Sequence, residues 1–163
     1  METKLVKTDD EIKGLVSLAD EIWHEAFSSL LSQSQIEYML DKFLSINAIK
    51  DSVKIGYEYY FLCDKDKVIG FTAICPKEDN TLFLSKLYIK KEYRGKGYLK
   101  GSFDFLKSYA KSNHFKSIWL TVNKHNDRAI AAYRKMGMDI IRSEVTDIGN
   151  GFSMDDYVFS LSV

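Results

Sequence analysis

The sequence predicts an α/β fold of the layered α+β kind, in which about four helices cover a mixed, mostly antiparallel sheet of six to seven strands. Three observations support this. Apolar residues recur at helical spacing through the first third of the chain, β-branched and aromatic residues form strand-like runs in the middle third, and helix and strand patterns alternate in the last part. The 163 residues contain no low-complexity tract, repeat or Gly/Ser linker, so a single domain over residues 1–163 is expected.

The first third is expected to contain a short strand and two helices. The strand covers residues 4–8, and the run Thr8–Glu11 then supplies a capping oxygen and first-turn acids for a helix that continues to Phe27. A second amphipathic stretch begins near Ser32 or Ser34 and carries its apolar residues on one side. This part therefore supplies helical cover for the sheet.

The remaining elements follow from strand-like runs and from helical spacing. Two strands flank the polar residues Asp64–Lys67 and form a hairpin, and the last two strands are joined by a turn that contains Gly149-Asn150-Gly151. In chain order the elements are strands over 59–63, 68–75 and 81–89, a helix over 98–113, a strand over 117–122, a helix over 126–136, and strands over 140–145 and 154–161.

The strand over residues 81–89 contains an irregularity in its alternation. Its apolar positions are first Leu82 and Leu84, and then Leu87 and Ile89. The phase therefore slips around Ser85-Lys86, and this slip predicts a β-bulge. The alternative is a strand that is buried on both faces, which would tolerate either phase.

Composition excludes several classes of protein. The 23 Lys and Arg residues balance the 23 Asp and Glu residues, so the chain lacks the basic surface of a nucleic-acid binder. The three histidines have no ligand-like spacing, so no metal is expected. Cys63 and Cys75 are interpreted as inert free thiols in a reducing compartment, and no apolar run approaches a membrane span. A cytoplasmic protein without membrane contact is therefore expected.

A basic, glycine-rich turn lies between a predicted strand and a predicted helix. It reads Arg94-Gly95-Lys96-Gly97, and the helix begins at Tyr98. Main-chain N–H groups in such a turn can converge on phosphate oxygens, and the helix N-terminus adds partial positive charge. A pyrophosphate fits this description, and a plain surface turn is the alternative.

A second segment downstream carries a family resemblance. Asn123 ends a predicted strand, and Asn126, Ala129, Tyr133 and Gly137 follow at the spacing Asn-x-x-Ala-x-x-x-Tyr-x-x-x-Gly. Together with the glycine-rich turn, this pattern resembles the Gcn5-related N-acetyltransferase (GNAT) superfamily over residues 82–138, and the expected element order fits the whole chain. Two positions depart from the family pattern: Leu99 stands where Gly or Ala is usual, and Met138 stands where Phe is usual.

The resemblance implies a GNAT-like sheet that is splayed at its centre and binds acetyl-coenzyme A. Leu87 and Ile89 would offer main-chain groups to the pantetheine arm, and Asn123 and Asn126 would hold the pantetheine and fix the loop. The alternative for Asn126 is a plain helix N-cap. The residues that would wrap the pyrophosphate, mainly through N–H groups, are Arg94, Gly95, Lys96, Gly97, Tyr98 and Leu99.

Tyr133 is the expected general acid. Alanines on its helix face leave room for a ligand beside the ring, and a phenol stays protonated at neutral pH and can protonate a departing thiolate. The alternative is a packed tyrosine whose hydroxyl is hydrogen-bonded. The general base is not assigned, because the stretch Leu84-Ser85-Lys86 has no carboxylate; Glu25, Glu58 and Glu78 are candidates by residue type only.

The resemblance implies an acetyl-coenzyme A-dependent N-acetyltransferase in which an amine attacks the thioester directly. The acceptor would be a small amine, polyamine-like or amino-acid-like, or a protein amine. A faint similarity to bacterial spermidine/spermine-type acetyltransferases lies in Trp23-His24-Glu25 and in residues 34–40. A homodimer is left open. The alternatives are a catalytically silent acyl-coenzyme A sensor and a protein-interaction module on the same fold.

Overall fold

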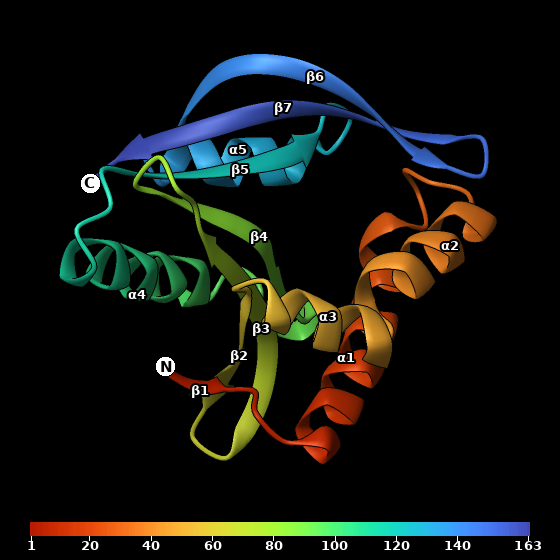
Figure 1. Cartoon of the computed structure of the whole chain (residues 1–163), viewed down its shortest axis with the longest axis horizontal. Coiled ribbons are helices and arrows are strands. Elements are labelled where there is room, and N and C mark those ends of the chain that lie inside the picture. Colours follow the sequence, from red (N-terminus) through yellow and green to blue (C-terminus); the bar gives the residue numbers. More distant parts are fainter. The chain divides into compact units, whose positions relative to one another are not determined.

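The computed structural model describes residues 1–163 and is built from seven strands, five α-helices and one short 3₁₀ helix (Figure 1). The strands are β1 (Glu2–Leu5), β2 (Glu58–Asp64), β3 (Lys67–Pro76), β4 (Thr81–Ile89), β5 (Ser117–Asn123), β6 (Asp139–Gly149) and β7 (Phe152–Ser162). The helices are α1 (Asp9–Phe27), α2 (Gln33–Leu44), α3 (Ile46–Lys54), η1 (Lys91–Tyr93), α4 (Tyr98–Ser112) and α5 (Asp127–Lys135). No helix is long and apolar enough to span a membrane.

The strands form one mixed sheet in the order β1-β2-β3-β4-β5-β7-β6, which confirms the predicted fold class. Helix α3 was not expected from the sequence. It begins after Ser45, whose side chain accepts a hydrogen bond from the Ala48 N–H at 3.2 Å, and only Ile49 of its residues is buried. A short helix with one buried residue gives almost no apolar periodicity, which is why the pattern did not reveal it.

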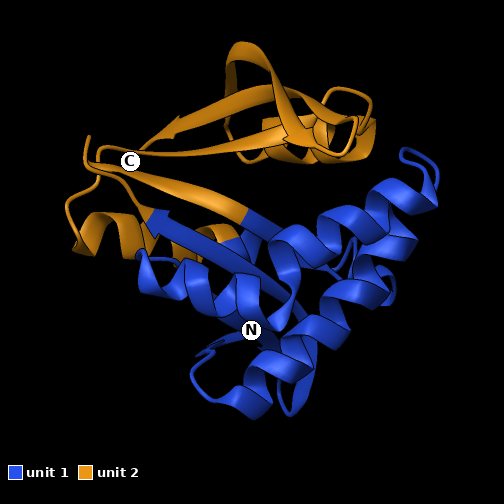
Figure 2. Cartoon of the chain, turned by 45° about the vertical axis from the view of Figure 1, so that its right-hand side comes forward, with its two compact units in different colours: residues 1–75, 86–102 blue, residues 76–85, 103–163 orange.

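The chain divides into two compact units, coloured separately in Figure 2. Unit 1 contains residues 1–75 and 86–102, and unit 2 contains residues 76–85 and 103–163. Strand β4 and helix α4 each contribute residues to both units. The two units are described separately below.

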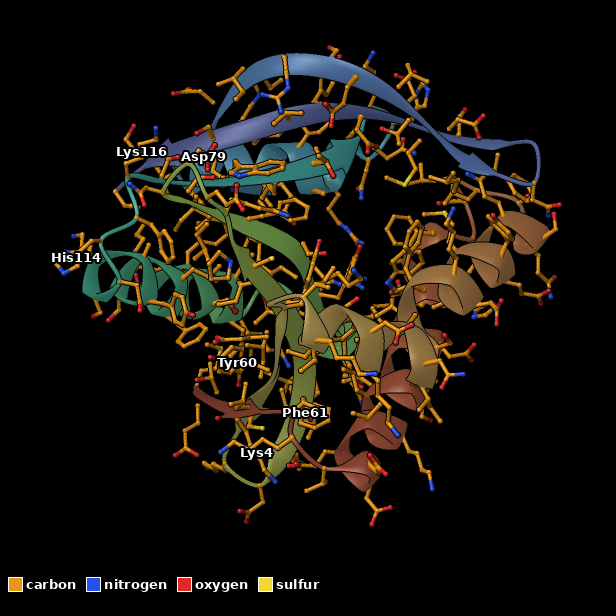
Figure 3. All side chains as sticks on the ribbon, in the orientation of Figure 1. Lys4, Tyr60, Phe61, Asp79, His114 and Lys116 are labelled. Atoms are coloured by element: carbon orange, nitrogen blue, oxygen red, sulfur yellow. The ribbon has the colours of Figure 1, made fainter.

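In unit 1, an antiparallel arrangement of β1, β2 and β3 is combined with α1, α2 and α3. Lys4 and Leu5 of β1 pair with Phe61 and Tyr60 of β2, which are labelled in Figure 3. Strand β1 ends at Leu5 rather than at residue 8, because the next residues turn into the cap of α1. The fully buried side chains of this unit include Leu15, Ile22, Ile36, Tyr59, Leu62 and Phe71.

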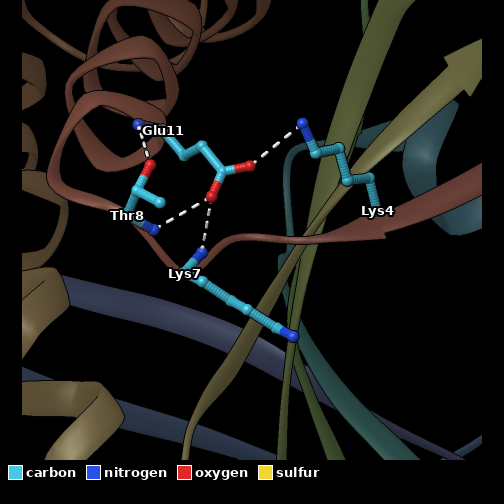
Figure 4. Close-up of polar contacts among 4 residues, drawn as sticks. All are labelled: Lys4, Lys7, Thr8 and Glu11. Atoms are coloured by element: carbon cyan, nitrogen blue, oxygen red, sulfur yellow. Dashed lines mark hydrogen bonds and ion pairs between the residues drawn. The ribbon is translucent and has the colours of Figure 1, made fainter.

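The start of α1 is fixed by a capping box, drawn in Figure 4. The Glu11 N–H donates to the Thr8 hydroxyl at 3.1 Å, and the Glu11 carboxylate accepts from the Thr8 N–H at 2.9 Å and the Lys7 N–H at 3.1 Å. Lys4 Nζ lies 3.1 Å from the same carboxylate. These contacts, led by the bond from the Thr8 N–H, lower the pKa of Glu11 to about 2.

The lowered pKa of Glu11 predicts a loss of stability in acid. An ordinary glutamate titrates at 4.5, so the ionised Glu11 contributes its full stabilisation above that pH, and the contribution disappears as the pH falls through about 2. We therefore expect Glu11→Gln to melt at a lower temperature than the native chain at pH 6 and at the same temperature near pH 2. Thermal melting across this pH range measures the difference. A gap that does not close in acid would contradict the assignment.

In unit 2, strand β5 lies between β4 and β7. The parallel ladder from β4 to β5 covers Thr81–Phe83, whereas the antiparallel ladder from β5 to β7 covers all seven residues of β5. The turn before β4 is tied to β5 by polar contacts: the Thr81 hydroxyl donates to the Asp79 carboxylate at 2.6 Å and accepts from the Trp119 indole at 3.0 Å. Figure 3 shows Asp79 and Lys116 together at this end of the unit.

Strand β4 changes its buried face where the sequence predicted a phase slip. Leu82 and Leu84 are buried, Ser85 and Lys86 are partly exposed, and Leu87 and Ile89 are buried again. The slip falls at the boundary between the two units, since residue 85 belongs to unit 2 and residue 86 to unit 1. The buried side chains of β4 therefore alternate in one phase up to Leu84 and in the other phase from Leu87.

The close approach of β3 to β4 gives a stability prediction at Gly70. A Cβ atom at Gly70 would lie 2.2 Å from the Tyr88 carbonyl oxygen and 3.1 Å from the Ile89 Cα, and neither backbone atom can rotate away. We expect Gly70→Ala to lower the free energy of unfolding by about 1–3 kcal/mol. Urea unfolding measures this value.

The matched control for that substitution is Gly14→Ala. Gly14 lies in the interior of α1, where an added Cβ meets only the Phe61 ring at 3.9 Å. There alanine should stabilise the chain by about 0.5–1 kcal/mol, because it reduces the conformational freedom of the unfolded state. Equal effects at the two glycines would contradict the close approach of the strands.

Candidate active site

The predicted phosphate-binding loop lies in unit 1, between η1 and the start of α4. Gly95 has φ of 72° and Gly97 has φ of 89°, so both adopt the left-handed conformation that favours glycine. A Cβ atom built at either glycine meets nothing within 4 Å. The surface above both glycines is therefore open to an incoming group.

Several main-chain N–H groups of this loop have no partner. Gly95 and Gly97 donate no main-chain hydrogen bond, and the first such bond of α4 runs from the Gly101 N–H to the Gly97 carbonyl at 3.1 Å. The N–H groups of Tyr98 and Leu99 lie in the first turn of α4, where an α-helix has no internal acceptor for them. This set of donors at a helix N-terminus is suited to bind phosphate oxygens.

Arg94 holds the loop to the rest of unit 1. Its Nη1 and Nη2 atoms donate to the two oxygens of Glu25 at 3.0 and 2.6 Å, and its Nε donates to the Ile89 carbonyl at 2.9 Å. The Arg94 charge is thus neutralised by Glu25 rather than left open for a phosphate. Lys96 is exposed, makes no ion pair and lies with its Nζ 5.8 Å from the centre of the Tyr93 ring. Lys96 is the cation that the loop offers to an anion.

Tyr98 fixes the first turn of α4. Its hydroxyl donates to the Asp64 carboxylate at 2.7 Å, and this hydrogen bond raises the pKa of the Tyr98 phenol. Its ring packs edge-on against Tyr93, with the centroids 6.1 Å apart. The side chain of Tyr98 is therefore occupied within unit 1, and its main-chain N–H has no acceptor within α4.

Leu87 and Ile89 are buried on β4, with 8% and 9% of their surface exposed. The Thr72 hydroxyl donates to the Lys86 carbonyl at 2.7 Å, and the Lys90 N–H donates to the Ile69 carbonyl at 2.8 Å. These two bonds hold the β4 segment against β3. The buried side chains of Leu87 and Ile89 thereby anchor the segment, and the Ile89 carbonyl is already occupied by the Arg94 Nε.

Asn123 and Asn126 form the turn between β5 and α5 in unit 2. The Asn126 side chain accepts from the Ala129 N–H at 3.2 Å, so it caps α5, as one of the two interpretations of the sequence expected. The Asn123 side chain accepts from the His125 N–H at 2.9 Å, and the Asn123 carbonyl accepts from the Asn126 N–H at 3.0 Å. Both side-chain oxygens therefore stabilise the turn, which leaves their amide NH₂ groups for other partners.

Tyr133 projects from α5 into an aromatic cluster of unit 2. Its ring centroid lies 6.2 Å from that of Phe103 and 6.0 Å from that of Phe159. The hydroxyl makes no hydrogen bond within the chain, so the packed alternative with a bonded hydroxyl is not what the structure contains. Burial raises the pKa of Tyr133 to about 12, and the phenol is therefore fully protonated at neutral pH.

The three carboxylates considered as general bases are occupied or exposed. Glu25 pairs with Arg94, Glu58 accepts from the Tyr60 hydroxyl at 2.7 Å, and Glu78 is exposed on the turn after β3. Two other titratable groups, Lys86 and Asp156, were not predicted to have shifted pKa values. Burial lowers the pKa of Lys86 to about 8 and raises the pKa of Asp156 to about 6. The alternation that places Asp156 in phase with buried Val158 along β7 was the available signal for Asp156.

The family of the chain is shown by its match to a known family model. A model of the acetyltransferase (GNAT) family matches residues 11–138. The chain belongs to this family. As a GNAT protein it is an N-acetyltransferase that depends on acetyl-coenzyme A, and the predicted resemblance is confirmed.

Solved structures share the GNAT fold over the whole chain. The PaiA N-acetyltransferase of Thermoplasma acidophilum, solved in complex with coenzyme A, is 19% identical with a TM-score of 0.79 and full coverage of both chains (100% each). An acetyltransferase from Streptococcus agalactiae is 18% identical, with a TM-score of 0.72 and coverage of 99% and 98%. The ribosomal-protein-S18-alanine N-acetyltransferase of Escherichia coli is 15% identical, with a TM-score of 0.69 and coverage of 99% and 93%.

The predicted site residues of this GNAT protein fall into two groups. Unit 1 brings together the loop from Arg94 to Leu99 and the main chain of Leu87 and Ile89. Unit 2 contains Asn123 and Asn126 at the turn between β5 and α5, and Tyr133 seven residues after Asn126 on α5.

Proposed function

We propose that this protein transfers the acetyl group of acetyl-coenzyme A to a primary amine by direct attack, with Tyr133 as the general acid. The observation that carries the proposal is the set of unpartnered N–H groups at Gly95, Gly97 and the first turn of α4, above which the surface is open. Unpartnered N–H groups at a helix N-terminus favour a diphosphate-binding site over a plain surface turn. Lys96 adds the local positive charge.

Binding of the cofactor is divided among main-chain and side-chain groups. The loop from Arg94 to Leu99 holds the diphosphate through N–H groups. The Arg94 side chain does not contact the diphosphate; it fixes the loop by its two hydrogen bonds to Glu25. The main chain of Leu87 and Ile89 pairs with the pantetheine arm in the manner of an added strand. The amide groups of Asn123 and Asn126 are available to its carbonyl oxygens.

The chemistry needs a proton donor for sulfur. When bound, acetyl-coenzyme A supplies a thioester whose carbonyl carbon is open to an amine. Tyr133 donates its hydroxyl proton to the sulfur as the carbon–sulfur bond breaks, which avoids the release of a free thiolate. Its unbonded hydroxyl and its pKa of about 12 support this role, since the proton is present throughout the neutral range. Main-chain N–H groups of β4 stabilise the developing oxyanion.

The acceptor is a primary amine, either a small polyamine-like or amino-acid-like molecule or a protein amine. Structures of similar fold include ribosomal-protein-alanine N-acetyltransferases from Brucella melitensis and Escherichia coli, which supports a protein amine as one candidate. Release of free coenzyme A from acetyl-coenzyme A, with a panel of polyamines, amino acids and peptides, tests the proposal. Cofactor binding without release by any acceptor would instead favour the acyl-coenzyme A sensor.

A further inference from the structure

Asp156 on β7 is a buried carboxylate without a partner. Only 5% of its surface is exposed, and its side chain makes no hydrogen bond and no ion pair. A buried charge is costly unless it is paired, so folded proteins rarely retain one without a function. Other members of the same strand, Val158 and Phe159, are fully buried and apolar, as packing alone would require. Asp156 therefore needs an explanation that packing does not give.

The sheet register determines which residues share its face. Asp156 lies directly opposite Asn123 of β5 and Glu144 of β6, and residues paired in this way point to the same side of a sheet. Its face thus carries the side chain of Asn123, one of the residues assigned to the pantetheine. Glu144 is partly exposed, with its Oε2 3.5 Å from the Nε of Arg142.

The cation that acts on Asp156 is Lys124, and it is held on the opposite face. Lys124 Nζ lies 2.9 Å from the Asp155 carboxylate and 5.5 Å from the centre of the Tyr157 ring, and both of these residues alternate with Asp156 along β7. Burial, Glu144 and Asp155 all raise the pKa of Asp156, and Lys124 only partly opposes them, so the value is about 6. The surroundings of Asp156 therefore contain more negative than positive charge, and a bound cation would offset the difference.

Asp156 and Tyr133 lie on opposite faces of the β5–β7 pair. Tyr133 packs against Phe159, which is three residues beyond Asp156 on a strand whose pairing with β5 is regular over its length. An odd separation places two side chains on different faces of a strand. Asp156 therefore faces away from the aromatic cluster that holds Tyr133.

We propose that Asp156 receives the ammonium group of the acceptor and removes its proton, acting as the general base of the transfer. This inference rests on the proposed function and deepens it, because it requires an acceptor that is a cationic primary amine. An amine whose reacting end carries an adjacent carboxylate would be repelled by Asp156. Aliphatic diamines and polyamines have the required chemistry.

An ammonium acceptor loses two protons in the reaction. One ammonium proton passes to the Asp156 carboxylate and from there to water, which leaves a neutral amine. The nitrogen lone pair forms the carbon–nitrogen bond, and the carbon–sulfur bond breaks as sulfur takes the Tyr133 proton. The nitrogen then loses a second proton to water, and water returns one to Tyr133. One acetyl group is transferred, and one thiol and one solvent proton are released.

The proposed role of Asp156 as a base predicts how the activity depends on pH. Asp156 must be ionised to accept a proton, so activity should rise with pH through about 6 and then level off. The charged groups that influence it are Glu144, Asp155 and Lys124. Because Glu144 raises the pKa of Asp156, Glu144→Gln should move the acidic limb of the profile to lower pH and leave the maximal rate unchanged.

Asp156→Asn tests the role directly, with Glu144→Gln as the matched control. We expect Asp156→Asn to lower kcat by on the order of 10²-fold and to abolish the acidic limb, with the affinity for acetyl-coenzyme A unchanged. The fold should survive, because the substitution removes an unpaired buried charge; melting at pH 7 checks this. Native turnover in Asp156→Asn, or a rise in KM alone, would overturn the inference.

A second measurement separates failure of the inference from failure of the proposed function. If the native chain releases no coenzyme A with any amine, the proposed function fails. Contact with an ammonium group is tested independently by following the carbon-13 carboxyl signal of Asp156 as a function of pH, in protein saturated with coenzyme A. Adding 1,4-diaminobutane should lower the titration midpoint, because a cation favours the carboxylate, whereas 1-butanol should not. A midpoint that diamine does not move would overturn the inference.

Discussion

Gly97→Val is expected to weaken binding of acetyl-coenzyme A by on the order of 10²-fold or more, while the chain remains folded. The reason is the geometry of the loop. The space above Gly97 is empty in the absence of ligand, so the valine side chain clashes with nothing in the protein. It would instead occupy the space that a phosphate needs to reach the N–H groups at the start of α4. Isothermal titration calorimetry measures the affinity.

The control for this substitution is Gly56→Val. Gly56 has φ of 105° and, like Gly97, has nothing within 4 Å of a built Cβ atom, but it lies between α3 and β2. Both valines should therefore cost about 1–3 kcal/mol of stability through backbone strain. Only Gly97→Val should lose cofactor affinity. Native affinity in Gly97→Val, or equal losses in both variants, would exclude the loop as the phosphate site.

The parts of the fold that could be predicted are those that local pattern determines. The strand from Thr81 to Ile89 was predicted with its observed limits, and its phase slip appears in the burial of its side chains. Both could be predicted because the alternation of a strand depends only on consecutive residues. The same holds for α4, whose start at Tyr98 follows from the glycines before it. Helix α3 was missed because a single buried residue, Ile49, leaves no period to detect.

The parts of the site that could not be predicted depend on residues that are distant in sequence. Arg94 was expected to add charge to the loop, but Glu25, 69 residues away, neutralises it. Asp156 was missed for a related reason. Its burial and its raised pKa come from strand pairing with β5 and β6, and no local pattern specifies which strands become neighbours. The motif gave candidate residues for the site, but not their electrostatic surroundings.

Tyr133→Phe is expected to lower the maximal rate by roughly 10²-fold or more and to leave the affinity for acetyl-coenzyme A within about twofold of native. Phenylalanine keeps the ring packing against Phe103 and Phe159, since only the hydroxyl is removed. That hydroxyl makes no hydrogen bond in the protein, so its loss should not lower the melting temperature. A fall in rate without a fall in stability is what separates a proton donor from a packed side chain.

The pH profile gives a second test of Tyr133. Its active form is the protonated phenol, and burial raises the pKa from 10.0 to about 12. The native rate should therefore show no decline caused by Tyr133 until the pH approaches that value, and any decline between pH 8 and 10 should persist in Tyr133→Phe. A decline in that range that the substitution removes would contradict the raised pKa.

Tyr109→Phe is the matched control for the loss of a phenol. Tyr109 lies on α4 in the same unit, is partly buried and packs against Phe105 and Phe115, with centroids 6.3 and 6.5 Å apart. Steady-state kinetics with acetyl-coenzyme A and the best acceptor should give a native kcat for Tyr109→Phe and the full loss for Tyr133→Phe. If Tyr133→Phe turns over at the native rate, another group or a water molecule protonates the sulfur, and the position of Tyr133 reflects packing alone.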